Sequence, residues 1–147
     1  MSSKSTIKSI INHHAEVGRE VTVEGWVRSR RTSKGGFSFI HIYDGSCFDT
    51  IQAVADEGLA NYADVQLLGT GCSVVITGTL VESSGKGQDR EIQASSVNVV
   101  GWVDDPESYP VSKKQHTYEY LRTVAHLRPR TNTFGAIARV RHAISAA

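Results

Sequence analysis

The sequence predicts an all-β fold with short helices, a five-stranded Greek-key barrel followed by a linker and a helical segment. Five β-rich runs precede residue 103, and one helical stretch separates the third run from the fourth. The charge balance also changes after Ser112: nine basic and fourteen acidic residues lie up to this point, and seven basic residues and one acidic residue follow. These observations predict a barrel domain at 1–103, a linker at 104–115 and a separate helical region at 116–147.

The first elements are a short helix and a long strand. Residues 6–14 place Ile7, Ile10 and Ile11 at helical spacing, so we expect a short amphipathic helix that plugs one end of the barrel. Residues 20–31 alternate apolar and polar side chains, and the alternation slips at Gly25. Such a slip predicts a β-bulge or a sharp bend at this glycine.

The second strand, residues 37–43, has large side chains on both faces. Alternation puts one set of side chains on one face (Phe37, Phe39, His41, Tyr43) and a second set on the other (Ser38, Ile40, Ile42). Only one of these faces can be the barrel core. The other therefore needs a different explanation.

The remaining β-rich runs complete the order of elements. Residues 50–54 form the third strand, 58–68 a short helix, and 72–82 and 91–100 the last two strands. Three strands, a helix and two strands is the order of the oligonucleotide-binding (OB) fold, in which the second and third strands form the ligand face.

The C-terminal part reads as linker and helices. Residues 101–112 contain two prolines and adjacent aspartates, which is typical of a linker, whereas 116–126 and 133–147 have helical spacing on either side of a break at 128–130. The last helix reaches Ala147 without a stop signal, so we expect the natural protein to continue beyond it.

Several function classes find no support. No apolar run is long enough for a membrane span, and no signal core follows the N-terminus, so we expect a cytoplasmic protein. Cys47 and Cys72 lack metal-ligand spacing and are expected to be reduced thiols. We find no catalytic constellation and no metal site, and we expect no cofactor in this chain.

One group of residues has the composition of an RNA site. Arg28, Arg30 and Arg31 end the first strand, Phe39 lies in the second and Gln52 in the third. In a barrel of this order we expect these positions to lie together on one open face. Single-stranded RNA needs cations for its phosphates, an aromatic ring for stacking and polar groups that read a base edge. A glutamine carboxamide matches the N3–H and O4 of uracil. The alternative, a core Phe39 and a solvated Gln52, is equally compatible with the spacing.

At these residues the sequence resembles the N-terminal anticodon-binding domain of the class IIb aminoacyl-tRNA synthetases, and among them the bacterial-type asparaginyl-tRNA synthetases. The resemblance rests on five stretches: VEGWVRSRR (23–31), FSFIHIYDGSCFDTIQ (37–52), TGTL (77–80), EIQA (91–94) and HLRPRTN (126–132). It implies that the partner is the anticodon loop of tRNA(Asn). Phe39 would stack on the central uridine, Gln52 would read it, Arg31 would lie nearby, and Gln93 would lie near the first anticodon base.

The resemblance also distinguishes among relatives. Aspartate-specific members typically have an aspartate where this chain has His41, and a glutamate where it has Gln93, so asparagine is favoured. An aspartate-specific synthetase domain therefore stays an alternative. A non-specific single-strand-binding OB module and a truncated paralogue that regulates or sequesters are the other two.

In the family a catalytic domain follows, which uses ATP and Mg²⁺ to attach asparagine to its tRNA and forms a homodimer. Its motifs are absent from this chain. We therefore expect residues 116–147 to be the helical start of that domain, and the chain alone to be monomeric, to bind tRNA weakly and to aminoacylate nothing.

Overall fold

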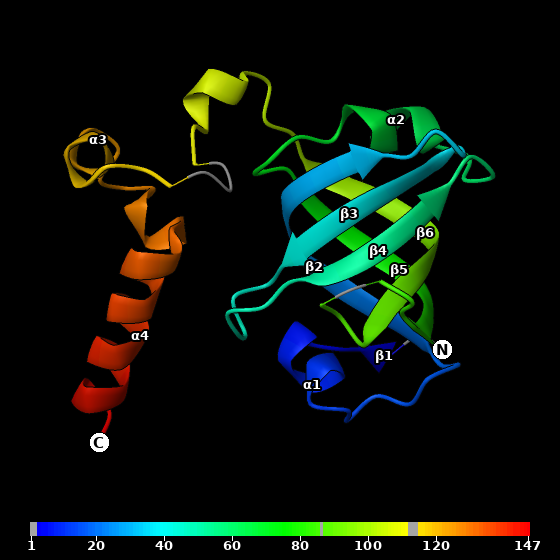
Figure 1. Ribbon diagram of the computed structural model, residues 1–147, viewed down its shortest axis with the longest axis horizontal. Coiled ribbons are helices and arrows are strands. Elements are labelled where there is room, and N and C mark those ends of the chain that lie inside the picture. Colours follow the sequence, from blue (N-terminus) through cyan, green and yellow to red (C-terminus); the bar gives the residue numbers. More distant parts are fainter. Residues whose placement is uncertain (1–2, 86, 112–114) are drawn as a thin grey trace.

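The protein, described by a computed structural model over residues 3–85, 87–111 and 115–147, is a closed β-barrel with a helical arm (Figure 1). The strands are β1 (Ser3–Lys4), β2 (Glu20–Thr32), β3 (Phe37–Tyr43), β4 (Ile51–Asp56), β5 (Ser73–Glu82) and β6 (Arg90–Gly101). The helices are α1 (Ile7–Ile11), α2 (Tyr62–Leu67), α3 (Tyr118–Thr123) and α4 (Asn132–Ser145), with short 3₁₀ turns at Pro106–Ser108 (η1) and Arg128–Arg130 (η2). The predicted elements are confirmed, and β1 is the one strand not anticipated.

The barrel closes because β2 is long enough to pair with two strands. The sheet order is β1-β2-β3-β4-β6-β5, and β2 also pairs with β5, which leaves β1 as a parallel addition to a five-stranded barrel. Gly25 lies where β2 passes from β5 to β3. A Cβ atom there would lie 2.6 Å from the carbonyl oxygen of Tyr43, so only glycine allows the strands to approach this closely.

The bulge itself is not at the predicted position. Pairing between β2 and β5 is regular through Gly25, and the register with β3 shifts between Val27 and Ser29. Arg28 is therefore the extra residue. At Gly25, β2 lies close to Tyr43 and passes from pairing with β5 to pairing with β3, and the bulge comes a few residues later.

The core is the interior of the barrel. Alternate residues of the five barrel strands point inward, and most of them, including Ile40 and Ile42 of β3, are almost completely buried. Ile7 and Ile10 of α1 close one end, and α2 with Val65 closes the other (Figure 1). The opposite face of β3, which carries Phe39, is therefore not part of the core.

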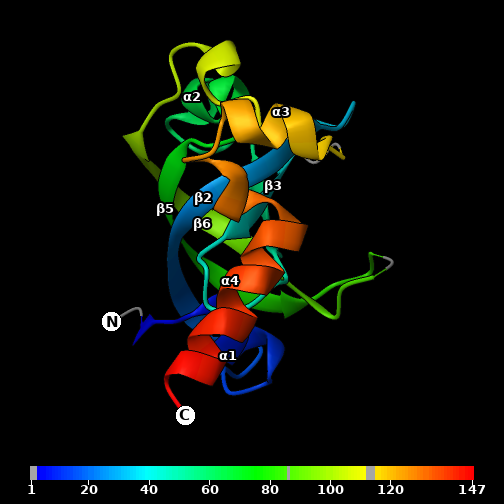
Figure 2. The same cartoon turned by 90° about the vertical axis from the view of Figure 1, so that its left-hand side faces the viewer.

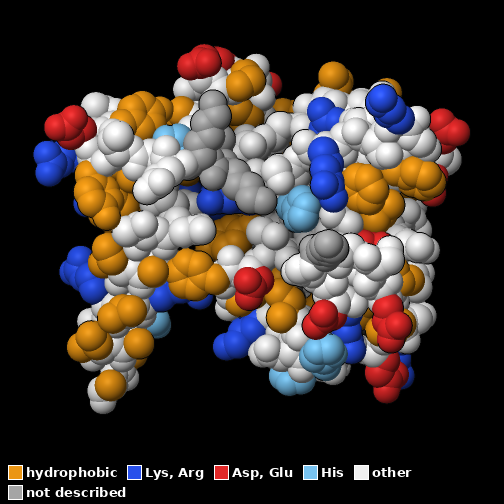
Figure 3. All heavy atoms as spheres, viewed as in Figure 1, with side chains coloured by type: hydrophobic (Ala, Val, Ile, Leu, Met, Phe, Trp, Pro, Cys, Tyr) orange, Lys and Arg blue, Asp and Glu red, His pale blue; other side chains and the backbone are white. Residues whose placement is uncertain are grey.

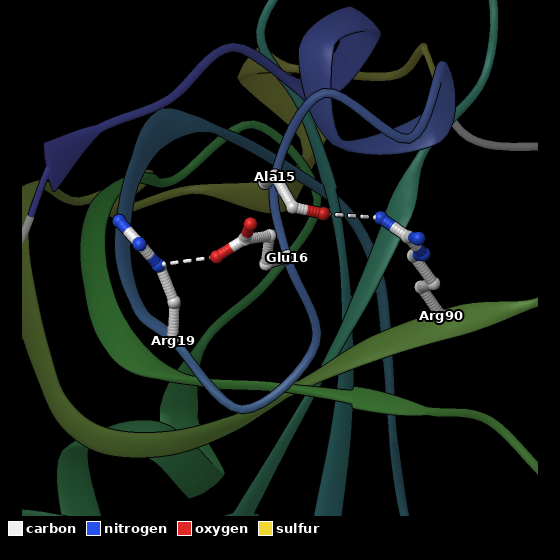
Figure 4. A network of polar contacts seen from close by, with 4 residues as sticks. All are labelled: Ala15, Glu16, Arg19 and Arg90. Atoms are coloured by element: carbon white, nitrogen blue, oxygen red, sulfur yellow. Dashed lines mark hydrogen bonds and ion pairs between the residues drawn. The ribbon is translucent and has the colours of Figure 1, made fainter.

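The N-terminal segment is fixed to the barrel by polar contacts (Figure 4). Arg90, at the start of β6, donates a hydrogen bond from Nη1 to the carbonyl oxygen of Ala15 at 2.6 Å. Asp44 accepts a hydrogen bond from the amide of Ile7 at 2.8 Å, and Arg19 forms an ion pair with Glu16. The loop between β3 and β4 is therefore tied to α1.

The C-terminal segment forms an arm beside the barrel (Figures 1 and 2). Ile137, Val140 and Ile144 leave an exposed apolar stripe along α4. Figure 3 shows hydrophobic side chains, in orange, along this arm at the lower left. The predicted linker at 104–115 contains η1 and lies in part, at residues 112–114, outside the described residues. Within the part of the chain that the structure describes, no helix is long and apolar enough to cross a membrane.

Candidate nucleic-acid interface

The outer face of β2, β3, β4 and β6 carries four of the six predicted RNA-binding residues in two neighbouring rows. Strand register places Arg31, Phe39, Val54 and Gln93 side by side across the four strands. The adjacent row contains Ser29, His41, Gln52 and Glu91. Residues paired in this way share a face of the sheet, so the sequence predictions for Arg31, Phe39, Gln52 and Gln93 converge on one surface.

Phe39 lies on this surface and not in the core. Its ring is partly exposed, whereas the preceding and following residues, Ser38 and Ile40, are fully buried on the inner face. The guanidinium carbon of Arg31 lies 4.9 Å from the ring centroid. The ring is therefore an aromatic platform covered by an exposed cation.

Gln52 is on the same face but is not open to solvent. The residue is only 4% exposed, and both ends of its carboxamide are engaged by neighbouring side chains. Nη2 of Arg31 lies 3.5 Å from Oε1, and Nε2 donates to Oε2 of Glu91 at 2.9 Å. The expectation of a freely accessible amide is thus not met in the protein alone.

Glu91 is a site residue that the sequence reasoning missed. Its Oε2 accepts hydrogen bonds from Gln52, from the hydroxyl of Ser83 at 2.9 Å and from Nε2 of Gln88 at 3.1 Å. Ser83 and Gln88 belong to the turn between β5 and β6, so this turn is linked to Gln52 through one carboxylate. The signal was available in part, since Glu91 and Gln93 must share a face of the same strand.

Arg30 is not on this face, contrary to the prediction that all three arginines share it. It pairs in register with the core residue Ile40, and its Nε donates to the carbonyl oxygen of Leu68 at 2.9 Å. Adjacent residues of a strand point to opposite sides, so Arg30 and Arg31 diverge. Arg30 holds the end of α2 against the barrel.

Arg28 is also directed elsewhere. It lies at the bulge, and its Nη1 donates to the carbonyl oxygen of Arg130 at 3.1 Å, with Nη2 3.5 Å from Oδ1 of Asn132. The bulge turns this side chain toward the C-terminal segment. Two of the three predicted arginines therefore have structural contacts, and Arg31 alone of the three lies beside Phe39.

The C-terminal arm covers the far end of the same face through arginine–aromatic contacts. The guanidinium of Arg130 lies 4.1 Å from the ring centroid of Trp26, and that of Arg139 lies 5.1 Å from the ring of Phe48. Arg139 also donates to the carbonyl oxygens of Gly45 and Cys47 in the β3–β4 loop. The arm thus contacts the end of the face at Trp26, which stays 37% exposed.

A hollow of about 380 Å³ borders this region at His41. It lies between α1, the start of β4 at Thr50 and the β5–β6 turn at Gln88 and Asp89. Among the described residues no group of three metal-ligating side chains occurs. Phe39, Gln52 and Arg31 give the surface a stacking group, a hydrogen-bonding group and a cation, which suit the binding of a flexible polar ligand.

Comparison with known proteins places this geometry in context. A family model described as an OB-fold nucleic acid binding domain matches residues 21–100, which span the five barrel strands except for the first residue of β2 and the last of β6. The match covers the rows that contain Phe39, Gln52 and Glu91.

Characterised relatives are similar over almost the whole chain. The asparagine–tRNA ligase of Hahella chejuensis is 66% identical over 140 residues, which are 95% of this chain and 30% of the relative. The asparagine–tRNA ligase of Glaesserella parasuis is 57% identical over 148 residues, or 100% of this chain and 32% of the relative. The chain thus spans about a third of the length of these relatives, and it matches their N-terminal OB-fold region.

Solved structures support the fold. Asparaginyl-tRNA synthetase from Pyrococcus horikoshii, complexed with asparaginyl-adenylate, superposes with a TM-score of 0.80 at 23% identity, covering 97% of this chain and 32% of that one. The Entamoeba histolytica enzyme gives a TM-score of 0.76 at 21% identity, covering 99% of this chain and 34% of that one. At this level of identity the likeness concerns the architecture of barrel and arm.

Proposed function

Because the chain belongs to the family of OB-fold nucleic acid binding domains, we propose that its outer face binds a tRNA anticodon loop, with Phe39 and Gln52 contacting the middle base. The observation that carries the proposal is the position of these two residues. They lie in adjacent rows of the same exposed face, with the cationic Arg31 touching both. An aromatic ring, a carboxamide and a cation at one place are the groups that an unpaired nucleotide requires.

Stacking on Phe39 supplies affinity. The ring lies on the outer face between β2 and β4, so a base turned out of a loop can lie against it. Such stacking contributes about 1 to 3 kcal/mol per base and does not depend on which base is present. Phe39 alone would thus make a binding site without sequence preference.

Gln52 supplies the choice of base. Its carbonyl oxygen has two lone pairs and its amide nitrogen two protons, so one of each remains after the contacts with Arg31 and Glu91. The remaining oxygen lone pair accepts from N3–H of uracil, and the remaining N–H donates to its O4. Cytosine has the reverse pattern at these two positions, so uracil is preferred.

Arg31 must move when the base enters. In the protein alone its guanidinium lies over the Phe39 ring and beside Oε1 of Gln52, where a stacked base would lie. The side chain is exposed and belongs to no ion pair among the described residues, so its displacement breaks one long hydrogen bond and one cation–π contact. In its new position it neutralises a phosphate of the loop.

The relatives point to tRNA(Asn) as the partner. In a longer protein, the chain would select this tRNA for the attachment of asparagine in the cytoplasm, and the longer protein would be a homodimer. We assign the Mg²⁺ and ATP of that reaction to the rest of the longer protein, and we expect this chain alone to be monomeric and to catalyse nothing.

The test is a titration of labelled anticodon stem-loop RNAs with the 147-residue chain at one fixed salt concentration. Loops with the anticodons GUU, GUC and GCC separate the effect of the middle base from that of its 3′ neighbour. We expect the GCC loop to bind about tenfold or more weakly than the GUC loop, the size of one well-made base contact. Equal affinities for all three loops would instead identify a non-specific single-strand-binding module.

A further inference from the structure

We propose that Glu91 is a specificity-determining residue that fixes the orientation of the Gln52 carboxamide and so makes the site select uracil over cytosine. This inference rests on the function proposed above. Rotating a glutamine carboxamide by half a turn exchanges the positions of its oxygen and nitrogen. A flipped Gln52 would present N–H to N3 of cytosine and a carbonyl oxygen to its N4 amino group. Without a constraint, the same residue could therefore read either pyrimidine.

Glu91 supplies the constraint because a carboxylate can only accept. Its Oε2 lies 2.9 Å from Nε2 of Gln52, so a flip would bring a carbonyl oxygen against the carboxylate oxygen. Ser83 and Gln88 donate to the same Oε2 and hold it in place. The orientation of the reading amide is thus determined by a neighbouring strand and turn.

Arg31 cannot perform this role once RNA is bound. In the protein alone it favours the same orientation by donating to Oε1 of Gln52, but at 3.5 Å the bond is long. The base that stacks on Phe39 displaces this guanidinium. Glu91 is then the group that still distinguishes the two ends of the amide, at the moment when the base is read.

The burial of the contact strengthens the effect. Gln52 is only 4% exposed, so a flipped amide would not exchange its lost hydrogen bond for one with bulk water. A buried polar group without a partner is unfavourable, and two facing oxygens are more so. The flipped state should accordingly be rare in the wild-type protein.

The experiment compares wild type with Glu91→Gln, using stem-loops with the anticodons GUU and GCU. A carboxamide at position 91 can offer either an oxygen or an N–H, so it no longer favours one orientation of Gln52. We expect the GUU loop to bind about as well as to wild type. The GCU loop should bind more tightly than to wild type, so that a preference of about tenfold or more falls to about twofold.

A gain of cytosine binding is the informative readout, because damage to the fold would weaken both loops. Glu82→Gln is the matched control: it removes the same charge from an exposed residue of the adjacent strand β5 and should leave the preference unchanged. Thermal unfolding of each variant verifies that the barrel is intact.

The outcomes separate the two proposals. If wild type binds both loops equally, Gln52 does not read the middle base and the proposed function fails with it. If wild type prefers GUU and Glu91→Gln keeps the full preference, the role of Glu91 is refuted and the proposed function stands. A proportional weakening of both loops would likewise refute it, since Glu91 would then have a structural role only.

Discussion

Phe39 is the residue on which affinity for every loop should depend. Replacing it with alanine removes the stacking surface, and we expect binding to fall by about 1 to 3 kcal/mol for GUU and GCU loops alike. Fluorescence anisotropy at constant salt measures the loss. Because the choice of base is attributed to Gln52, the ratio between the loops should not change.

Phe37 provides a matched control in the same strand. It is on the same outer face and is 43% exposed, but among the described residues the cation–π partner of Arg31 is Phe39 and not Phe37. Phe37→Ala should weaken binding much less than Phe39→Ala. An equal loss of affinity would mean that RNA binding depends on the exposed aromatic rings of β3 in general and not on Phe39 in particular.

Arg31 and Arg30 of β2 differ in what they should contribute to binding. Arg31→Ala should lower the slope of log affinity against log salt by about one, since one phosphate contact is lost. Arg30→Ala should leave the slope unchanged, because that side chain is bound to the carbonyl oxygen of Leu68. Titration at several salt concentrations distinguishes them, and a shared change of slope would contradict the opposite orientations.

At the scale of elements, the close approach of β5 and β6 depends on Gly78. A Cβ atom at this position would lie 2.1 Å from the carbonyl oxygen of Gln93, which is impossible without separating the strands. We expect Gly78→Ala to reduce the free energy of unfolding by at least about 1 to 3 kcal/mol, measured by urea denaturation. Because Gln93 is in the row of Phe39, RNA binding should weaken as well.

Gly69 is the appropriate control for this substitution. A Cβ atom added there would have no heavy atom within 4 Å, so Gly69→Ala should leave the stability within about 0.5 kcal/mol of wild type. Similar losses for both variants would show that backbone freedom, and not strand spacing, is what the glycines provide.

For the whole molecule, the sequence was sufficient to predict the strands of the barrel, but not to predict which side chains contact one another on its surface. Apolar alternation predicted each barrel strand to within about two residues, because burial of one face imposes a period of two. The same alternation correctly separated Phe39 from Ile40. It could also have separated Arg31 from Arg30, since adjacent strand residues cannot share a face.

The other surface details depend on contacts between distant parts of the chain. Glu91 meets Gln52 because β6 pairs in parallel with β4, and the alternation within each strand does not give the register of that pairing. Arg28 turns away because a bulge and a segment a hundred residues later lie beside it. Gln52 is buried because Arg31 of β2 and Glu91 of β6 both engage its carboxamide, so the open amide expected from the sequence was incorrect.

The hydrogen bonds from Arg139 to the β3–β4 loop connect the C-terminal arm to the strand that contains Gln52. The loop carbonyls that Arg139 holds, those of Gly45 and Cys47, precede the reading strand β4 by only a few residues. The position of α4 is accordingly coupled, through the guanidinium of Arg139, to the stretch of chain that leads into Gln52. A displacement of α4 would therefore act on the segment that places this side chain.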